Sequence, residues 1–111
     1  MFRGFRQSHF GSAFFFLDFE IDGEIVEFKY ISDLKGNIDK LSSGLSRRIL
    51  DGGSQASKVS LDATDQAGMT KEIAERAVKR AFGSLRKRNS DAIKEVRIYG
   101  KDFDITVPYE K

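Results

Sequence analysis

The stretch that decides the fold is residues 14–31, FFFLDFEIDGEIVEFKYI, in which two strand-like runs flank Asp22-Gly23. Both runs are rich in β-branched and aromatic residues, and the second alternates between polar and apolar side chains. Asp-Gly between two such runs is a strong signal for a two-residue hairpin turn. We therefore predict two antiparallel strands, Phe14–Ile21 and Glu24–Ile31.

A two-residue turn also fixes which residues of the two strands face each other, and it places Asp18 opposite Glu27. Directly opposed Cβ atoms lie about 4.5–5.5 Å apart, and Lys29 follows Glu27 on the same face because strand side chains alternate. Two carboxylates this close are stable only with a cation between them or with one of them protonated. Hard oxygen ligands of this kind suit Mg²⁺ or Mn²⁺.

The plain alternative is that these charges lie on the solvated outer face of a ribbon. Four large apolar residues share the predicted face with the charged trio, namely Phe14, Phe16, Ile25 and Ile31. A face with this much apolar surface is covered more often than solvated, so we expect the charges at the rim of a covered surface. Glu20, two residues beyond Asp18 on the same strand, is an auxiliary candidate for the same site.

The segments that follow the hairpin alternate between helical and strand patterns. Apolar residues at helical spacing predict a helix over residues 32–50, closed by Asp51-Gly52-Gly53. A short strand is expected over residues 58–61, followed by a second helix that has Thr70 as N-cap and runs to about Phe82.

Alternating residues on either side of Gly100 predict a last strand pair. The resulting order, β-β-α-β-α-β-β, predicts an α/β protein with a mixed β-sheet flanked by helices. The length of 111 residues fits one domain over residues 1–111.

Composition narrows the chemistry that such a domain can perform. The chain has no cysteine and a single histidine, His9, which excludes disulfide scaffolds, thiolate metal sites and cysteine nucleophiles and disfavours a Ser-His-Asp triad. Its longest uncharged apolar run, Ala13–Leu17, is far too short to cross a membrane, so we expect no membrane partner. Any reaction must therefore rest on carboxylates, lysines and arginines.

Charge is distributed unevenly along the chain. Residues 1–40 hold five basic and seven acidic side chains, whereas residues 41–111 hold fourteen basic and ten acidic ones. Six basic residues without an intervening acid form a stripe: Arg76, Lys79, Arg80, Arg86, Lys87 and Arg88. A solubilising helix face is the plain interpretation, but six positive charges together favour contacts with the phosphates of a nucleic acid. Nothing in the stripe distinguishes DNA from RNA.

The segment LDFEIDGEIVEFKY resembles the core motif of the PD-(D/E)xK, or restriction-endonuclease-like, nucleases. It is most similar to the nuclease toxin domains at the C-termini of contact-dependent inhibition and related polymorphic toxins. The resemblance assigns Asp18, Glu27 and Lys29 to catalysis and gives the metal to Asp18, Glu27 and the carbonyl of Phe28. It extends over residues 13–65 and includes Gln55 as a second auxiliary residue.

The resemblance implies a Mg²⁺- or Mn²⁺-dependent endonuclease that hydrolyses phosphodiester bonds of tRNA or DNA. As a toxin domain of a longer protein, it would act in the cytoplasm of a target bacterium and have a cognate immunity protein. Two alternatives stay open: a structure-selective repair or resolvase-type nuclease, and a non-catalytic module that binds nucleic acid or protein. Because the family core begins with a helix, residues 1–12 would be a flexible or truncated segment, or a homodimer would complete the core.

Overall fold

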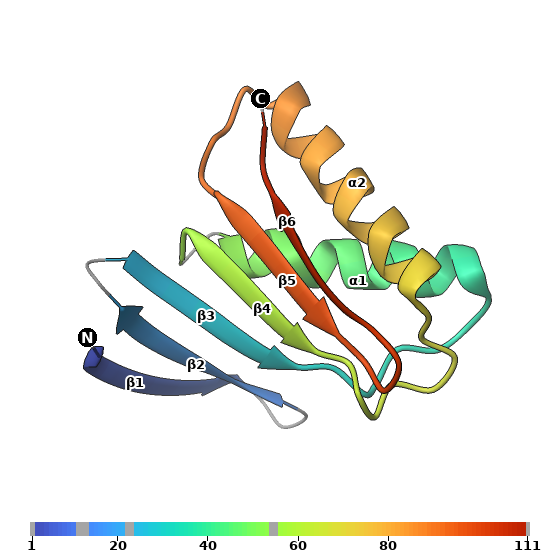
Figure 1. Ribbon diagram of the computed structural model, residues 1–111, viewed down its shortest axis with the longest axis horizontal. Coiled ribbons are helices and arrows are strands. Elements are labelled where there is room, and N and C mark those ends of the chain that lie inside the picture. The colour runs from blue at the N-terminus through green and yellow to red at the C-terminus, as the bar shows by residue number, and fades with distance from the viewer. Residues whose placement is uncertain (1, 11–13, 22–23, 54–55, 111) are drawn as a thin grey trace.

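The computed structural model describes residues 2–10, 14–21, 24–53 and 56–110. The elements follow one another as β1 (Phe2–Phe10), β2 (Phe14–Ile21), β3 (Glu24–Tyr30), α1 (Ile38–Gly53), β4 (Lys58–Asp62), α2 (Lys71–Lys87), β5 (Glu95–Tyr99) and β6 (Asp104–Pro108). The strands form one six-stranded sheet in the order in which they occur in the sequence (Figure 1). The β3–β4 and β4–β5 pairs are parallel and the other three pairs are antiparallel. The predicted α/β class with a mixed sheet is confirmed.

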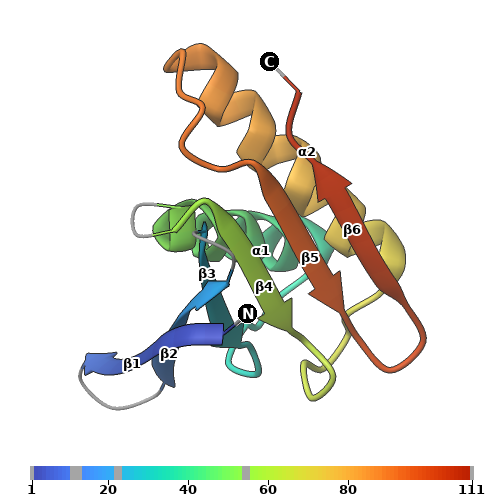
Figure 2. The same cartoon turned by 60° about the vertical axis from the view of Figure 1, so that its left-hand side comes forward.

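Both helices lie on one face of the sheet, behind β4, β5 and β6 in Figure 2. The reason is topological, because α1 and α2 each connect parallel strands and both connections step in the same direction across the sheet. Right-handed crossovers of this kind place their helices on the same side. The core lies between the two layers and includes the fully buried Leu45, Ile49, Leu61, Ala81 and Ile98.

The predicted hairpin register is confirmed. Asp18 pairs with Glu27 and Phe19 with Val26, as a two-residue loop requires. The loop residues themselves, Asp22 and Gly23, lie outside the described part of the chain. The side chains of β2 and β3 therefore share the sheet faces that the sequence predicts for them.

The first twelve residues contain a strand that the sequence analysis did not place. We expected a flexible or truncated segment there, but residues 2–10 form β1 and pair antiparallel with β2. The order is thus β-β-β-α-β-α-β-β, one strand longer than predicted. FRGFRQSHF lacks a clean alternation of apolar and polar residues, and its glycine and arginines are weak strand signals.

The first helix begins six residues later than predicted. Asn37 caps it, since its side-chain oxygen accepts a hydrogen bond from the Lys40 backbone N–H at 3.0 Å, and Gly36 precedes it with a φ of +117°. Leu34 therefore lies outside the helix and packs against it at Gly44, where an added Cβ would come within 2.9 Å of the Leu34 side chain. The residue fits the helical spacing because it packs against the same core.

The C-terminal half follows the prediction more closely. Thr70 caps α2, and its hydroxyl accepts a hydrogen bond from the Ile73 N–H at 3.2 Å. The helix continues past the predicted end at Phe82 to Lys87, so residues 83–87 are also helical. The strand over residues 58–61 and the last strand pair are confirmed. Neither α1 nor α2, the helices of the described residues, is long and apolar enough to cross a bilayer.

Candidate active site

Charged positions gather where β2 and β3 meet, on the sheet face that carries the helices. One row of paired residues crosses the entire sheet on this face, running Arg6, Asp18, Glu27, Val59, Val96, Val107. The positions on β1, β2 and β3 are charged, whereas those on β4, β5 and β6 are valines that face the core. The adjacent row has Lys29 beside Leu61 and Ile98. The sheet therefore changes from an apolar to a charged surface between β4 and β3.

Glu27 and Lys29 lie deeper than the sequence predicted. We expected charges at the rim of a covered surface, but Glu27 is 0% exposed and Lys29 only 4%. Acidic and basic side chains are almost never buried so completely unless they are paired. The Lys29 Nζ lies 3.8 Å from one carboxylate oxygen of Glu27, so the two form a buried ion pair. Of the apolar residues predicted to share this face, Ile31 is fully buried whereas Ile25 is 37% exposed.

Helix α1 supplies the cover and one of the contacts. The Lys29 Nζ donates a hydrogen bond to the backbone carbonyl of Arg48 at 3.0 Å, within the C-terminal half of the helix. Cations are stabilised near the C-terminal end of a helix, where the carbonyl dipoles point outward. Gly52 allows this approach, because a Cβ there would lie 3.0 Å from both methyl groups of Val59 and 3.6 Å from the Lys29 Cε.

Burial lowers the pKa of Lys29, because the charged ammonium loses its hydration. The nearby carboxylates of Glu27 and Asp51 oppose this effect, and the Arg48 guanidinium adds to it. The amine is therefore easier to deprotonate than that of a surface lysine.

Arg48 and Asp33 brace the same part of the helix. The guanidinium donates two hydrogen bonds to the two carboxylate oxygens, at 3.1 and 2.8 Å. This bidentate pair joins the segment after β3 to the turn of α1 whose carbonyl holds Lys29. Hydrogen bonding to Arg48 lowers the pKa of Asp33, so the pair is charged at neutral pH.

The donors at this position suit a small divalent cation. Among the side chains that the structure describes, no three His, Cys, Asp or Glu residues cluster as metal ligands. Mg²⁺ does not need three, because it usually takes one or two carboxylates and keeps several waters. Glu27 provides one carboxylate, the register position directly opposite it is Asp18, and Phe28 provides a backbone carbonyl between Glu27 and Lys29. These residues fit Mg²⁺ or Mn²⁺.

Of the two auxiliary candidates, Glu20 is placed by its strand register and Gln55 is not among the described residues. Glu20 pairs with Ile25, one row away from the Asp18–Glu27 pair and on the same face. Gln55 lies outside the described residues. Sequence reasoning missed Arg6, whose register position is directly opposite Asp18. Only recognition of β1 as a strand could have found it.

Two residues of the predicted basic stripe contact other parts of the chain. Arg76 faces α1, where it contacts Asp39 at 3.4 Å. Arg86, ten residues later, lies beside the C-terminal segment, where its side chain donates to the Glu110 carbonyl and lies over the Tyr109 ring. Lys79 is on the Arg86 side, seven residues earlier along the helix. All six residues of the stripe are exposed, and their contact with a nucleic acid stays a prediction.

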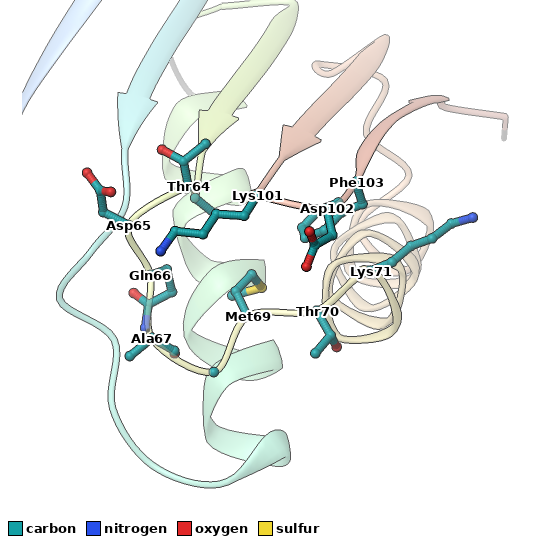
Figure 3. A pocket seen from close by; sticks show the side chains of 12 residues that line it. Thr64, Asp65, Gln66, Ala67, Met69, Thr70, Lys71, Lys101, Asp102 and Phe103 are labelled. Atoms are coloured by element: carbon teal, nitrogen blue, oxygen red, sulfur yellow. Dashed lines mark hydrogen bonds between the residues drawn. The ribbon is translucent and has the colours of Figure 1, made fainter.

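A cavity of about 480 Å³ lies away from the acidic pair, at the C-terminal ends of β4 and β5 (Figure 3). Its wall includes Gln66, which is 6% exposed and makes hydrogen bonds to both the N–H and the carbonyl of Leu34. Sequence reasoning missed this residue, which braces the loop before α1. The polar atoms of Gln66 are all engaged with the backbone, so this residue serves the structure of the loop.

No family model matches the chain, and comparisons with curated proteins and with solved structures also gave no match. The function must therefore be argued from the charged positions of β2 and β3.

Proposed function

We propose that this protein is a metal-dependent nuclease whose active site is formed by Asp18, Glu27 and Lys29. The observation that carries the proposal is the complete burial of Glu27 and Lys29 on a strand whose neighbour, β4, has Val59 and Leu61 at the paired positions. A sheet built for stability alone has apolar residues at such positions. Retaining an acid and a lysine there has a cost in desolvation, which a reaction can explain.

The order of elements supports the same proposal. A hairpin with the acid on its first strand and the E-x-K sequence on its second, followed by a helix and then a strand parallel to the second, is the arrangement that the resemblance to PD-(D/E)xK nucleases implies. In this proposal Asp18, Glu27 and the Phe28 carbonyl hold the metal. The bound ion would polarise the scissile phosphate and acidify a water.

Lys29 has the remaining role. Its ammonium is held by the Arg48 carbonyl and by the Glu27 carboxylate. From that position it orients the attacking water and stabilises the negative charge that develops on the phosphate oxygens. The substrate is tRNA or DNA, and, as in the toxins that the sequence resembles, an immunity protein would be the natural partner.

The test is cleavage of total tRNA and of plasmid DNA, with and without Mg²⁺, by the wild type, Glu27→Gln and Asp104→Asn. Asp104 is an exposed carboxylate at the far edge of the same sheet and serves as the matched control. We expect Mg²⁺-dependent cleavage by the wild type and the control, and a loss of at least about a hundredfold in Glu27→Gln because metal binding and phosphate activation fail together.

Equal cleavage by the wild type and Glu27→Gln would overturn the assignment. Cleavage confined to branched DNA would favour the repair or resolvase alternative. If neither nucleic acid is cleaved and Mn²⁺ does not bind, the non-catalytic module is the correct interpretation.

A further inference from the structure

The outer surface of the helical layer has a groove between α1 and α2. It has a volume of about 420 Å³ and is lined by Asp39, Lys40, Ser43, Gly44, Arg47 and Arg80. The two helices that form it are joined only through β4 in the sequence, so no local pattern reveals it. The basic stripe predicted over residues 76–88 did not include Lys40 or Arg47.

The three basic side chains of the groove are available to a ligand. Lys40, Arg47 and Arg80 are exposed, and no side-chain hydrogen bond or ion pair engages any of them within the described ranges. The stem of Lys40 lies over Gly36, where a Cβ would come within 2.7 Å of it, so the glycine allows the side chain to take this path.

The one acid of the groove does not cancel this charge. Asp39 is held by Arg76 at 3.4 Å, at the edge where the two helices cross. With Arg76 included, four positive charges surround one negative charge. A concave surface of one sign concentrates its field and attracts ligands of the opposite sign.

We propose that this groove binds the sugar–phosphate backbone of a nucleic acid strand, with Lys40, Arg47 and Arg80 as its phosphate contacts. The inference rests on the proposed function and deepens it, because it identifies where the substrate is held outside the metal site. Two arginines and a lysine favour phosphate over other anions, since guanidinium groups match the geometry of phosphate oxygens. The Ser43 hydroxyl adds a neutral donor of the kind that contacts backbones without reading sequence.

The groove and the proposed metal site lie on different sides of the same helix. Lys29 contacts the Arg48 carbonyl beneath α1, and the adjacent residue, Arg47, lines the groove. An α-helix is roughly 10 Å across, so a strand held in the groove needs only a few nucleotides to reach the metal. This arrangement provides affinity away from the reacting phosphate.

The test measures binding without catalysis. Short fluorescein-labelled RNA and DNA strands are titrated in EDTA at several salt concentrations, and anisotropy reports the Kd. The groove variant is Lys40→Ala/Arg47→Ala/Arg80→Ala. The matched control is Lys35→Ala/Lys71→Ala/Lys101→Ala, which removes three exposed charges that lie outside both the groove and the basic stripe. Circular dichroism verifies that both variants are folded.

We expect the groove variant to bind at least about tenfold more weakly and to reduce the salt slope by about two to three, whereas the control changes the Kd less than about twofold. The charge-preserving variant Lys40→Arg/Arg47→Lys/Arg80→Lys should bind within a few-fold of the wild type. Equal losses in the groove and control variants would overturn the proposal, because net charge alone would then explain binding.

Two further results separate the possibilities. If polyglutamate competes with RNA as effectively as unlabelled RNA does, the groove is a site for an acidic protein and the proposal is wrong. Because the assay contains no metal, groove-dependent binding by a protein that cleaves nothing would support the groove while refuting the nuclease.

Discussion

Two acid–base pairs lie on opposite faces of the sheet and differ in burial and in the distance between their charged groups. Arg97 and Asp104, on β5 and β6, form a bidentate pair at 3.0 and 2.7 Å with side chains 46% and 51% exposed. Glu27 and Lys29 approach only to 3.8 Å and are almost completely buried. The better hydrogen-bond geometry belongs to the pair that water already stabilises, and the larger desolvation cost belongs to the pair with the poorer geometry. Stability alone therefore does not explain the buried pair.

The largest effect that separates the two pairs should come from removing the basic partner of each. Lys29→Met should lower the free energy of unfolding by about 3–5 kcal/mol, because the buried Glu27 carboxylate loses the adjacent ammonium. Arg97→Met should leave the urea midpoint unchanged, since its partner Asp104 remains hydrated. Urea unfolding followed by circular dichroism measures both.

A second substitution verifies the cause. Glu27→Gln in the Lys29→Met background should regain much of the lost stability, because no buried charge is then left uncompensated. If Lys29→Met is instead as stable as Arg97→Met, burial has little effect on the Glu27–Lys29 pair, and the proposed difference between the two pairs is wrong.

Mn²⁺ binding should also distinguish the two pairs, through a smaller difference in the stability of the folded state. A ligand that binds only the folded state stabilises it by about 2.7 kcal/mol at a hundredfold excess over its Kd. Mn²⁺ should therefore raise the Tm of the wild type and of Asp104→Asn, whereas Glu27→Gln should show no rise. Comparing each variant with and without Mn²⁺ removes any effect of the substitution on stability itself. A rise in Glu27→Gln equal to that of the wild type would place the ion elsewhere.

The parts of this fold that the sequence predicts are those set by local chemistry. Asp22-Gly23 fixed the hairpin and hence the Asp18–Glu27 register, and Thr70 marked the start of α2. Local signals failed where tertiary packing decides the structure. Leu34 has helical spacing because it packs on α1 from outside, and β1 is a strand despite weak propensity because β2 offers it an edge.

The site divides in the same way. The identity and order of Glu27 and Lys29 are visible in the sequence, but their burial is not, because it depends on how α1 lies across β3. The same is true of the groove, where Arg47 and Arg80 come together only through the packing of two helices. Periodicity along one element cannot reveal a surface that two elements share.

The smallest effect concerns the pair that lies between the two extremes, Asp33 with Arg48, whose side chains are 43% and 18% exposed. Arg48 lowers the pKa of Asp33, so the pair stabilises the folded state above the ordinary aspartate pKa of about 3.9 and loses that contribution as the pH falls through the lower folded value. Asp33→Asn should therefore be less stable than the wild type by about 0.2–1 kcal/mol at pH 7, a figure limited by solvent screening. The difference should shrink below about pH 4 as Asp33 becomes protonated in the wild type. Urea unfolding at neutral and acidic pH measures it, and a difference that grows on acidification would mean that Arg48 is not what stabilises the charged form.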